Sequence, residues 1–301
     1  MTTARITIPT PSNFSFWRTA YSHGWCDLVP FSFDLEKKEL RRILRLQRNV
    51  LVDCRLHGED HQAVIHVTSR SRLTAGQLAE TQGAIRTMLR LDEEFARFHA
   101  VAREHPQFRW IAQRGAGRLL RTPTVFEDVV KMLCTTNCTW ALTKIMVTNL
   151  VQWFGKKLDD ELHAFPEPET IAGSTEQFLR TRIKAGYRAP YLLELANRVA
   201  SGQLDIESWR HSTLPTEQLF KQMREVKGIG PYAAGNILKL VGRYDYLGLD
   251  SWVRQQFSKL HKKGRKVKDS TIEKHYATFG EWRGLFFWLE MTRDWHDEKF
   301  R

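Results

Sequence analysis

Short apolar runs with partial alternation mark the stretch between residues 43 and 70. The runs at 43–47, 50–56 and 63–67 are typical of β-strands. The intervening segment 57–60 (His-Gly-Glu-Asp) predicts a hairpin turn between the last two strands. The pattern therefore predicts a small antiparallel sheet in the N-terminal third of the chain.

Helical periodicity follows from Thr74 to the end of the chain. A helix is expected to start at Thr124, whose hydroxyl can cap it while Glu127 reaches back to complete a capping box. Together these patterns predict an α+β fold that is mostly α, with a small N-terminal antiparallel sheet domain at 1–92 and a helical domain at 93–301. Further helices are expected over 174–182, 190–200, 216–225, 232–242, 251–260 and 271–292.

The composition is that of a folded protein, with 42% hydrophobic and 27% charged residues among 301. No apolar run approaches the roughly 20 residues that cross a bilayer. The first fourteen residues are polar and include Pro9 and Pro11, so they do not predict a signal peptide. We therefore expect neither a secreted nor a membrane-spanning protein, but a cytoplasmic one, associated with the nucleoid if its source is bacterial.

Basic residues exceed acidic ones by 46 to 34, which gives a net charge of +12. Such an excess favours a polyanionic partner, usually nucleic acid, with a membrane surface as the alternative. The segment 259–268 carries six basic residues in ten. It is read either as a solvated loop or as a loop that contacts phosphates.

The four cysteines are Cys26, Cys54, Cys134 and Cys138. Cys134 and Cys138 have no Cys or His partners nearby at zinc-like spacing, and no group of four closely spaced cysteines could hold an iron–sulfur cluster. We therefore expect reduced thiols, no iron–sulfur cluster and no required cofactor.

The segment 219–257 is the most informative part of the chain. Two apolar helical stripes flank Lys227-Gly228-Ile229-Gly230, which is followed by Pro231. Glycines on either side of Ile229 permit a tight turn, and proline suits the first position of the next helix. Free backbone N–H groups there can bind phosphate without reading sequence. An ordinary helical hairpin is the simpler interpretation.

Asp250 stands directly before another apolar helix pattern, where aspartate is a favoured N-cap. A carboxylate fixed at a helix start can also stabilise a sugar that becomes cationic, or activate water. The two roles are compatible.

The string 226–234 (Val-Lys-Gly-Ile-Gly-Pro-Tyr-Ala-Ala), followed by Asp250 eighteen residues after Tyr232, resembles the helix-hairpin-helix DNA glycosylase superfamily. The resemblance implies a helix-hairpin-helix motif over about 216–242, with Tyr232 among its DNA-binding residues, and Asp250 as the catalytic aspartate. Bifunctional members carry a nucleophilic lysine where this chain has Tyr232. A phenol cannot form their imine, and neither Lys227 nor Lys239 is a natural replacement, so the resemblance implies a glycosylase without lyase activity.

Two upstream segments resemble the 8-oxoguanine branch of this superfamily. They are 134–137 (Cys-Thr-Thr-Asn) and 186–189 (Gly-Tyr-Arg-Ala). The resemblance implies that Asn137 fills the gap left by a flipped base, while Tyr187 wedges into the duplex and Arg188 contacts the estranged base. On local sequence alone, these are a buried cap and a surface turn.

The segment 281–284 (Glu-Trp-Arg-Gly) resembles a stretch of the alkyl-purine branch. It opens a helix carrying Trp288, which with Asn236 is a candidate for the base pocket, although a core position is the simpler interpretation of Trp288. Gly284 replaces the residue that binds the base edge in 8-oxoguanine enzymes. The family also suggests a structural monovalent cation on the backbone carbonyls of Arg224, Val226 and Ile229.

Together, these resemblances imply a monomeric, monofunctional DNA N-glycosylase of base excision repair. It would flip a damaged purine out of double-stranded DNA and hydrolyse its N-glycosidic bond. Alkylated purines are expected first, because many are cationic and suit an aromatic pocket. An 8-oxoguanine-type glycosylase and a non-catalytic helix-hairpin-helix DNA-binding protein are the alternatives.

Overall fold

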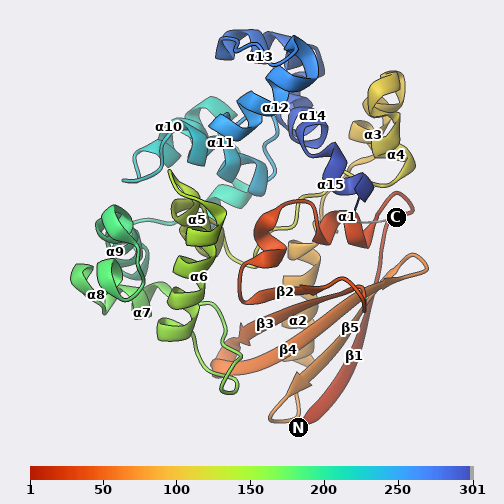
Figure 1. Cartoon of the computed structure of the whole chain (residues 1–301). Coiled ribbons are helices and arrows are strands. Elements are labelled where there is room, and N and C mark those ends of the chain that lie inside the picture. The colour runs from red at the N-terminus through yellow and green to blue at the C-terminus, as the bar shows by residue number, and fades with distance from the viewer. Residues whose placement is uncertain (299–301) are drawn as a thin grey trace. The chain divides into compact units, whose positions relative to one another are not determined.

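The structure is a computed structural model that describes residues 1–298 (Figure 1). The chain forms two compact units, each built from two separate stretches. The first unit contains residues 1–94 and 118–206, and the second contains 95–117 and the chain from 207 onward. The first unit therefore combines the sheet with helices from the region that the sequence assigns to the helical domain.

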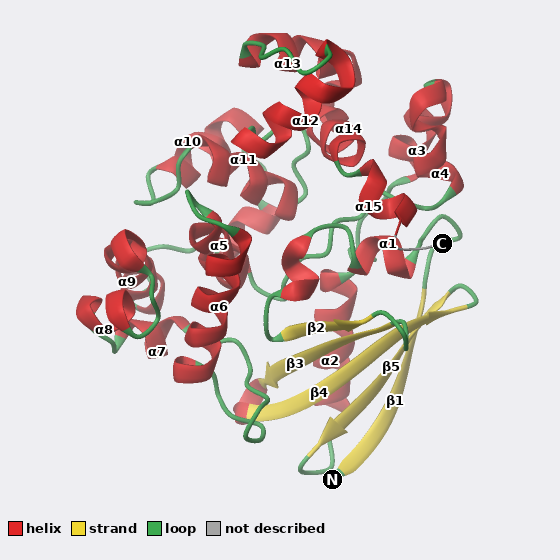
Figure 2. Cartoon of the chain, viewed as in Figure 1, coloured by secondary structure: helices red, strands yellow, loops and turns green. Residues whose placement is uncertain are grey.

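A five-stranded antiparallel sheet forms the framework of the first unit (Figure 2). The predicted sheet is confirmed, and it also has two edge strands that the hydrophobic pattern did not reveal. Edge strands pair on one side only, so they carry fewer buried residues to mark them; in β1, Ile8 is fully buried while most of its neighbours are exposed. The strand order is β1-β5-β4-β3-β2, with β1 Thr2–Pro9, β2 Phe31–Asp34, β3 Glu39–Leu46, β4 Val50–Glu59 and β5 Gln62–Ser69.

The hairpin between β4 and β5 turns later than predicted. Glu59 pairs with Gln62, so the turn is Asp60-His61, and residues 57–59 belong to β4. Position 58 needs glycine because a Cβ there would lie 2.7 Å from the Cβ of Phe16. The chain does not turn at this residue. The turn was predicted too early because Gly58 was interpreted as a turn residue, whereas it allows the close approach of Phe16.

The helices of the first unit include the predicted one after Thr124, which is confirmed. The Thr124 hydroxyl accepts from the Glu127 amide at 3.3 Å. The predicted return bond from Glu127 is wrong, because its buried carboxylate pairs instead with Arg42 at 2.5 Å and Lys131 at 2.7 Å. The helices are α1 Phe16–Ala20, α2 Ala75–Met88, α5 Val125–Thr135, α6 Trp140–Phe154, α7 Pro168–Ala172, α8 Glu176–Thr181 and α9 Ala189–Ala200.

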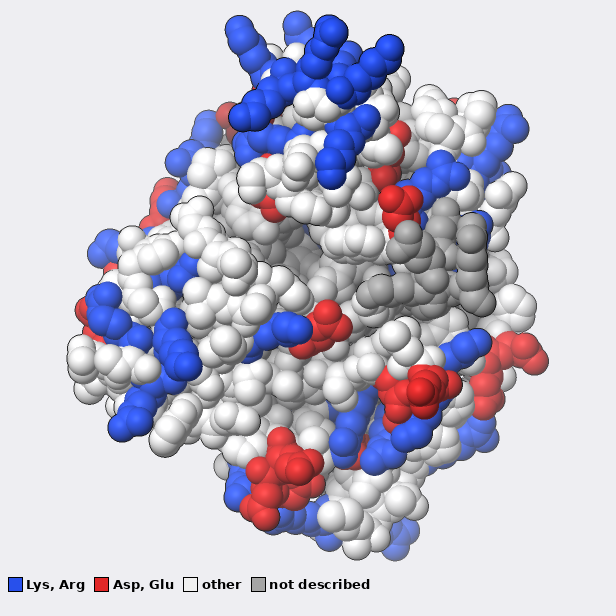
Figure 3. All heavy atoms as spheres, in the orientation of Figure 1, with Lys and Arg blue, Asp and Glu red and all other residues white. Residues whose placement is uncertain are grey.

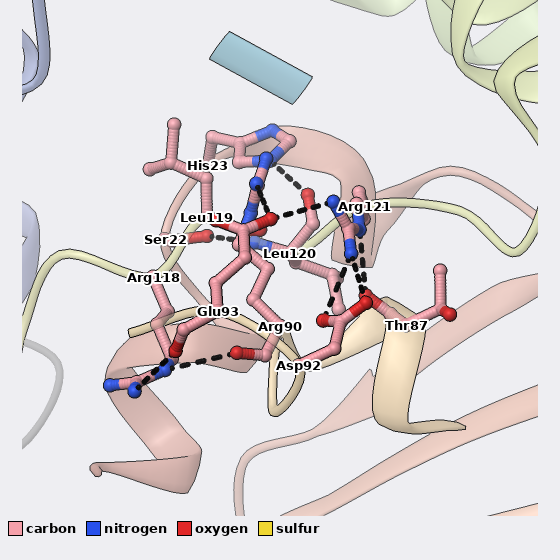
Figure 4. A network of polar contacts seen from close by, with 10 residues as sticks. All are labelled: Ser22, His23, Thr87, Arg90, Asp92, Glu93, Arg118, Leu119, Leu120 and Arg121. Atoms are coloured by element: carbon pink, nitrogen blue, oxygen red, sulfur yellow. Dashed lines mark hydrogen bonds and ion pairs between the residues drawn. The ribbon is translucent and has the colours of Figure 1, made fainter. Parts of the chain in front are cut away.

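A buried polar network joins the end of α2 to the returning segment 118–122 (Figure 4). Arg90 donates to the Leu119 carbonyl at 2.6 Å, and both Arg90 and Arg121 reach the Glu93 carboxylate at 2.7 Å. Buried guanidinium groups need such partners, because an unpaired buried charge is costly. The network explains why residues 118 onward pack with the first unit.

The second unit is helical, and its longest predicted helix is broken. The expected helix over 271–292 is two helices, α13 and α14, separated at Gly280, whose φ is +51°. Among the described residues, no helix combines the length and the apolar composition needed to span a bilayer. The helices are α3 Ala96–Glu104, α4 Arg109–Gln113, α10 Thr216–Arg224, α11 Pro231–Leu240, α12 Ser251–Lys262, α13 Asp269–Tyr276, α14 Arg283–Met291 and α15 Arg293–Glu298.

Candidate functional site

The predicted helical hairpin is present in the second unit, where a short turn joins α10 to α11. Gly228 has a φ of +88°, in the left-handed region that favours glycine. The Ile229 side chain is only 3% exposed, and its amide donates to the Val226 carbonyl at 3.0 Å. Ile229 therefore anchors the turn, and Pro231 begins α11 as expected.

Gly230 leaves the start of α11 open. Its φ is −81°, which any residue can adopt, and a Cβ built on it would meet no atom within 4 Å. Neither strain nor packing within the described chain requires glycine here. The small residue instead keeps backbone accessible at a helix N-terminus, where amide groups and the helix dipole favour an anion.

The loop that leads to Asp250 makes its closest approach to α11 at two glycines. A Cβ on Gly235 would lie 3.0 Å from the Gly248 Cα. A Cβ on Gly248, whose φ is +69°, would lie 2.7 Å from the Lys239 Nζ and 3.0 Å from the Asn236 side chain. Side chains larger than hydrogen would push the loop off the helix.

Lys239 fastens the same loop to α11 from inside. Its ammonium group donates to the Leu247 carbonyl at 2.7 Å, and to the Gly235 carbonyl and the Asn236 Oδ1 at 3.2 Å each. The side chain is 2% exposed. Burial lowers the pKa of Lys239 to about 7, while the negative charge of Asp250 acts in the opposite direction. Lys239 therefore positions the loop and is electrostatically coupled to Asp250.

Asp250 is the N-cap of α12, as its sequence context predicts. Its Oδ1 accepts from the Val253 amide at 2.8 Å, and the residue is partly buried. At the same helix start, Arg254 makes a bidentate pair with Asp269 at 2.8 and 2.9 Å. The Asp250 carboxylate thus sits at a fixed position, with one oxygen on the helix start.

Trp288 belongs to a group of three partly buried tryptophans. Its ring centroid lies 6.4 Å from that of Trp252 and 5.9 Å from that of Trp295. Trp252 is two residues after Asp250, in the first turn of α12. The tryptophans are therefore neither fully core nor fully exposed, which suits stacking against a planar ligand.

The structure gives Asn236 and Gly284 defined packing roles. Asn236 donates from Nδ2 to the Tyr232 carbonyl at 2.9 Å and accepts from Lys239, so its place in a base pocket stays a prediction. A Cβ on Gly284 would lie 2.0 Å from the Tyr246 carbonyl oxygen. The loop backbone therefore occupies the space that a base-reading side chain at 284 would need.

The three predicted wedge residues lie together in the first unit. Asn137, whose φ is +46°, and Tyr187 are exposed, and the Asn137 amide donates to the Tyr187 hydroxyl at 3.4 Å. Arg188 is 4% exposed, stacks on Tyr187 at 4.4 Å and donates to the Thr136 hydroxyl at 3.3 Å. It supports this turn, and its contact with an estranged base stays a prediction.

Lysine and arginine side chains gather over α12 and α13 (Figure 3). The six basic residues of 259–268 are all exposed. These six side chains form a strongly positive surface near the C-terminal end of α12. Such a surface can attract a polyanion.

Sequence reasoning did not assign Lys239 or Trp252 a place in the site. Lys239 interrupts an apolar stripe between Leu238 and Leu240, and a lone charge in such a stripe is a signal of a buried, partnered group. Trp252 had no comparable signal, because its neighbours Trp288 and Trp295 are distant in sequence.

Comparison with known proteins places the chain beside DNA glycosylases, although no protein-family model matches its sequence. YfjP of Bacillus subtilis (strain 168), provisionally named a DNA-3-methyladenine glycosylase, is 23% identical over 171 residues. The match spans 55% of this chain and 58% of that relative.

Several solved structures match nearly the whole chain. The 3-methyladenine DNA glycosylase of Archaeoglobus fulgidus has a TM-score of 0.76 at 17% identity, covering 97% of this chain and 99% of that one. The 8-oxoguanine glycosylase/lyase of Clostridium acetobutylicum, bound to double-stranded DNA, has a TM-score of 0.72 at 19% identity, with 94% and 93% covered. These similarities confirm the predicted fold.

Replacing Gly248 with alanine tests the close approach of the loop to α11. We expect Gly248→Ala to lower the free energy of unfolding by about 2–4 kcal/mol, because it combines left-handed strain with overlap on Lys239. Gly264→Ala is the matched control, since Gly264 has a φ of +80° but no atom within 4 Å of its Cβ, and should cost about 1 kcal/mol. Urea unfolding of both variants measures the difference. Equal losses would contradict the contact.

Proposed function

We propose that this chain, which has the fold of the helix-hairpin-helix DNA glycosylases, excises a damaged purine from double-stranded DNA in base excision repair. The observation that carries the proposal is Asp250, a partly buried carboxylate fixed at the start of α12. The loop that precedes it is fastened to the hairpin helix α11 through Lys239. The fold alone would permit other activities, whereas this carboxylate is suited to one kind of reaction.

The chemistry follows from placing a negative charge beside a sugar that becomes cationic. Loss of the base leaves positive charge on C1′ and the ring oxygen, and a preorganised carboxylate stabilises that charge. Asp250 Oδ1 is occupied by the Val253 amide, which leaves the second oxygen to face the sugar or to orient the attacking water. Water then completes the hydrolysis and leaves an abasic site.

The enzyme is proposed to have no lyase activity. Lyase chemistry in this superfamily needs an amine at the position of Tyr232, and a phenol cannot form an imine with the sugar. Lys239 is held by carbonyl groups in the interior of its unit. Water is therefore the proposed nucleophile.

The proposed substrates are alkylated purines. Many of them are cationic, and the electron-rich rings of Trp252, Trp288 and Trp295 suit a cationic planar base. A specific observation supports oxidised guanine as a second candidate: the Asn137 amide donates to the Tyr187 hydroxyl at 3.4 Å, so two residues that resemble those of 8-oxoguanine enzymes lie together. Asn137, Tyr187 and Arg188 are proposed to stabilise the gap in the duplex.

The turn from Lys227 to Gly230, with Tyr232 in the first turn of α11, is proposed to bind the DNA backbone through open amide groups. The carbonyl groups of Arg224, Val226 and Ile229 are oxygen donors of the kind that suits an alkali cation, and Val226 keeps one lone pair beyond its bond to Ile229. We propose that they hold a monovalent cation that would neutralise phosphate charge. The protein is proposed to act as a monomer without a required cofactor.

Removing the negative charge of Asp250 tests the proposed reaction. Asparagine also caps helices well, so Asp250→Asn should fold and bind DNA normally. We expect base release to fall at least about 100-fold, because the charge that stabilises the cationic sugar is gone. The measurement uses duplexes with one alkylated or one oxidised purine, followed by alkaline cleavage of abasic sites. Wild-type protein that releases neither base would favour a non-catalytic DNA-binding protein, and unchanged turnover in the variant would refute the role of Asp250.

Adding a single methyl group at Gly230 tests the backbone grip. Gly230→Ala meets no protein atom, so folding should be nearly unchanged, but the methyl group would obstruct an approaching phosphate. We expect affinity for undamaged duplexes of any sequence to fall roughly fivefold, the loss of about one hydrogen bond. Gly83→Ala in α2, which also meets no atom, is the control and should bind as wild type does. Equal affinity of the two variants for DNA would argue against phosphate binding by the backbone amides at the start of α11.

Borohydride reduction tests the absence of lyase activity. An enzyme that uses water forms no imine with the sugar, so borohydride should trap no covalent complex during turnover on a lesion that it releases. Installing an amine with Tyr232→Lys provides the comparison. A trapped complex with the wild-type protein would reveal an amine nucleophile and disprove the proposal.

A further inference from the structure

Three potential metal ligands from three helices converge in the second unit. His261, His275 and Glu290 are each the next-to-last residue of their helix, in α12, α13 and α14 respectively. Their ligand atoms, two imidazole nitrogens and a carboxylate oxygen, all lie within 4.8 Å of one another. Two histidines and a carboxylate form a ligand set that binds zinc in many proteins.

The spacing of His261 and Glu290 fits two ligands of one ion. The His261 Nε2 lies 3.2 Å from the Glu290 Oε2. Two tetrahedral zinc ligands at bond lengths of about 2.0–2.1 Å are roughly 3.3 Å apart. The buried Nε2 has no hydrogen-bond partner among the described residues, so its short approach to the carboxylate is not a hydrogen bond. The separation of the two atoms therefore matches that of two zinc ligands.

The surroundings orient the three ligands. The buried Tyr276 hydroxyl donates to the Glu290 Oε2, which fixes the carboxylate. The Phe257 ring lies 4.7 Å from the His261 ring and 5.3 Å from the His275 ring, and the two imidazoles are 4.4 Å apart. Hydrogen-bonded partners such as Tyr276 set ligand orientation in metal sites. His275 is exposed, whereas His261 and Glu290 are partly buried.

The local field favours a cation in spite of the basic surface nearby. Each ligand lies in the last turn of its helix, where carbonyl groups and the helix dipole carry negative charge. The neighbouring Lys262 and Lys274 are exposed, so water screens their charges.

We propose that His261, His275 and Glu290 bind one divalent cation of the zinc class, with water in the fourth position. The ion would join the C-terminal ends of α12, α13 and α14, and its role would be structural. The alternative for the same atoms is a protonated His261 paired with Glu290, which requires no metal. The two differ in whether the folded protein takes up one ion.

The test uses the full-length chain, free of any affinity tag and stripped of metal by a chelator. We expect it to bind one Zn²⁺ per chain in competition with a chromophoric chelator. Zn²⁺, but not Mg²⁺, should raise its melting temperature. His261→Gln, His275→Gln and Glu290→Gln should each weaken zinc binding by more than about 100-fold, and Tyr276→Phe by about 10-fold or more.

Glu290→Gln is the decisive variant, because its amide oxygen can still accept from Tyr276 while the anionic ligand is lost. Circular dichroism checks that it folds.

His57→Gln is the matched control: His57 also sits near a glutamate, at 2.9 Å from Glu59, but its ring stacks on His66, with the two ring planes 12° apart. It should bind zinc as wild type does. A folded wild-type protein that takes up no stoichiometric Zn²⁺, or a Glu290→Gln variant that binds it equally well, would overturn the proposal. None of these readouts involves DNA, so the result is independent of the proposed glycosylase activity.

Discussion

The candidate site depends on the close approach of one loop to one helix. Gly235 and Gly248 bring the loop that precedes Asp250 against α11, and the buried Lys239 ammonium holds it there through the Leu247 carbonyl. The hairpin turn at one end of α11 and the carboxylate at the start of α12 are thereby parts of one rigid arrangement. A carboxylate can stabilise a developing positive charge effectively only when it is fixed beforehand, and this contact fixes the loop that precedes Asp250.

The charges in this arrangement support one another. Burying an ammonium group is unfavourable, which is why the pKa of Lys239 falls to about 7. The negative charge of the nearby Asp250 carboxylate offsets part of that cost. Lys239 therefore contributes by fixing the loop that precedes Asp250.

The sequence predicted the hairpin, the N-cap at Asp250 and the sheet because each depends on local chemistry. Glycines beside Ile229, proline at a helix start and aspartate before an apolar stripe act within a few residues. Two predictions failed, the turn at Gly58 and the single helix that spans α13 and α14. Both failed because glycine serves several structural purposes. Gly58 accommodates Phe16, whereas Gly280 breaks a helix with a positive φ. The contacts of Lys239 and Trp252 could not be predicted from the sequence, because they depend on which distant segments meet in space.

Helix α12 carries Asp250 at its start and one of the three proposed metal ligands near its end. Asp250 caps its first turn, and His261 lies in its last turn, beside His275 and Glu290. Twelve residues of α-helix are about 18 Å long, so an ion at the C-terminal end would not touch the reacting sugar. It would act by restraining the helix on which the carboxylate is mounted. A helix secured at one end by Lys239 and the loop, and at the other by three ligands, cannot tilt without breaking one of them. The precision required of a single carboxylate is a physical reason for holding both ends.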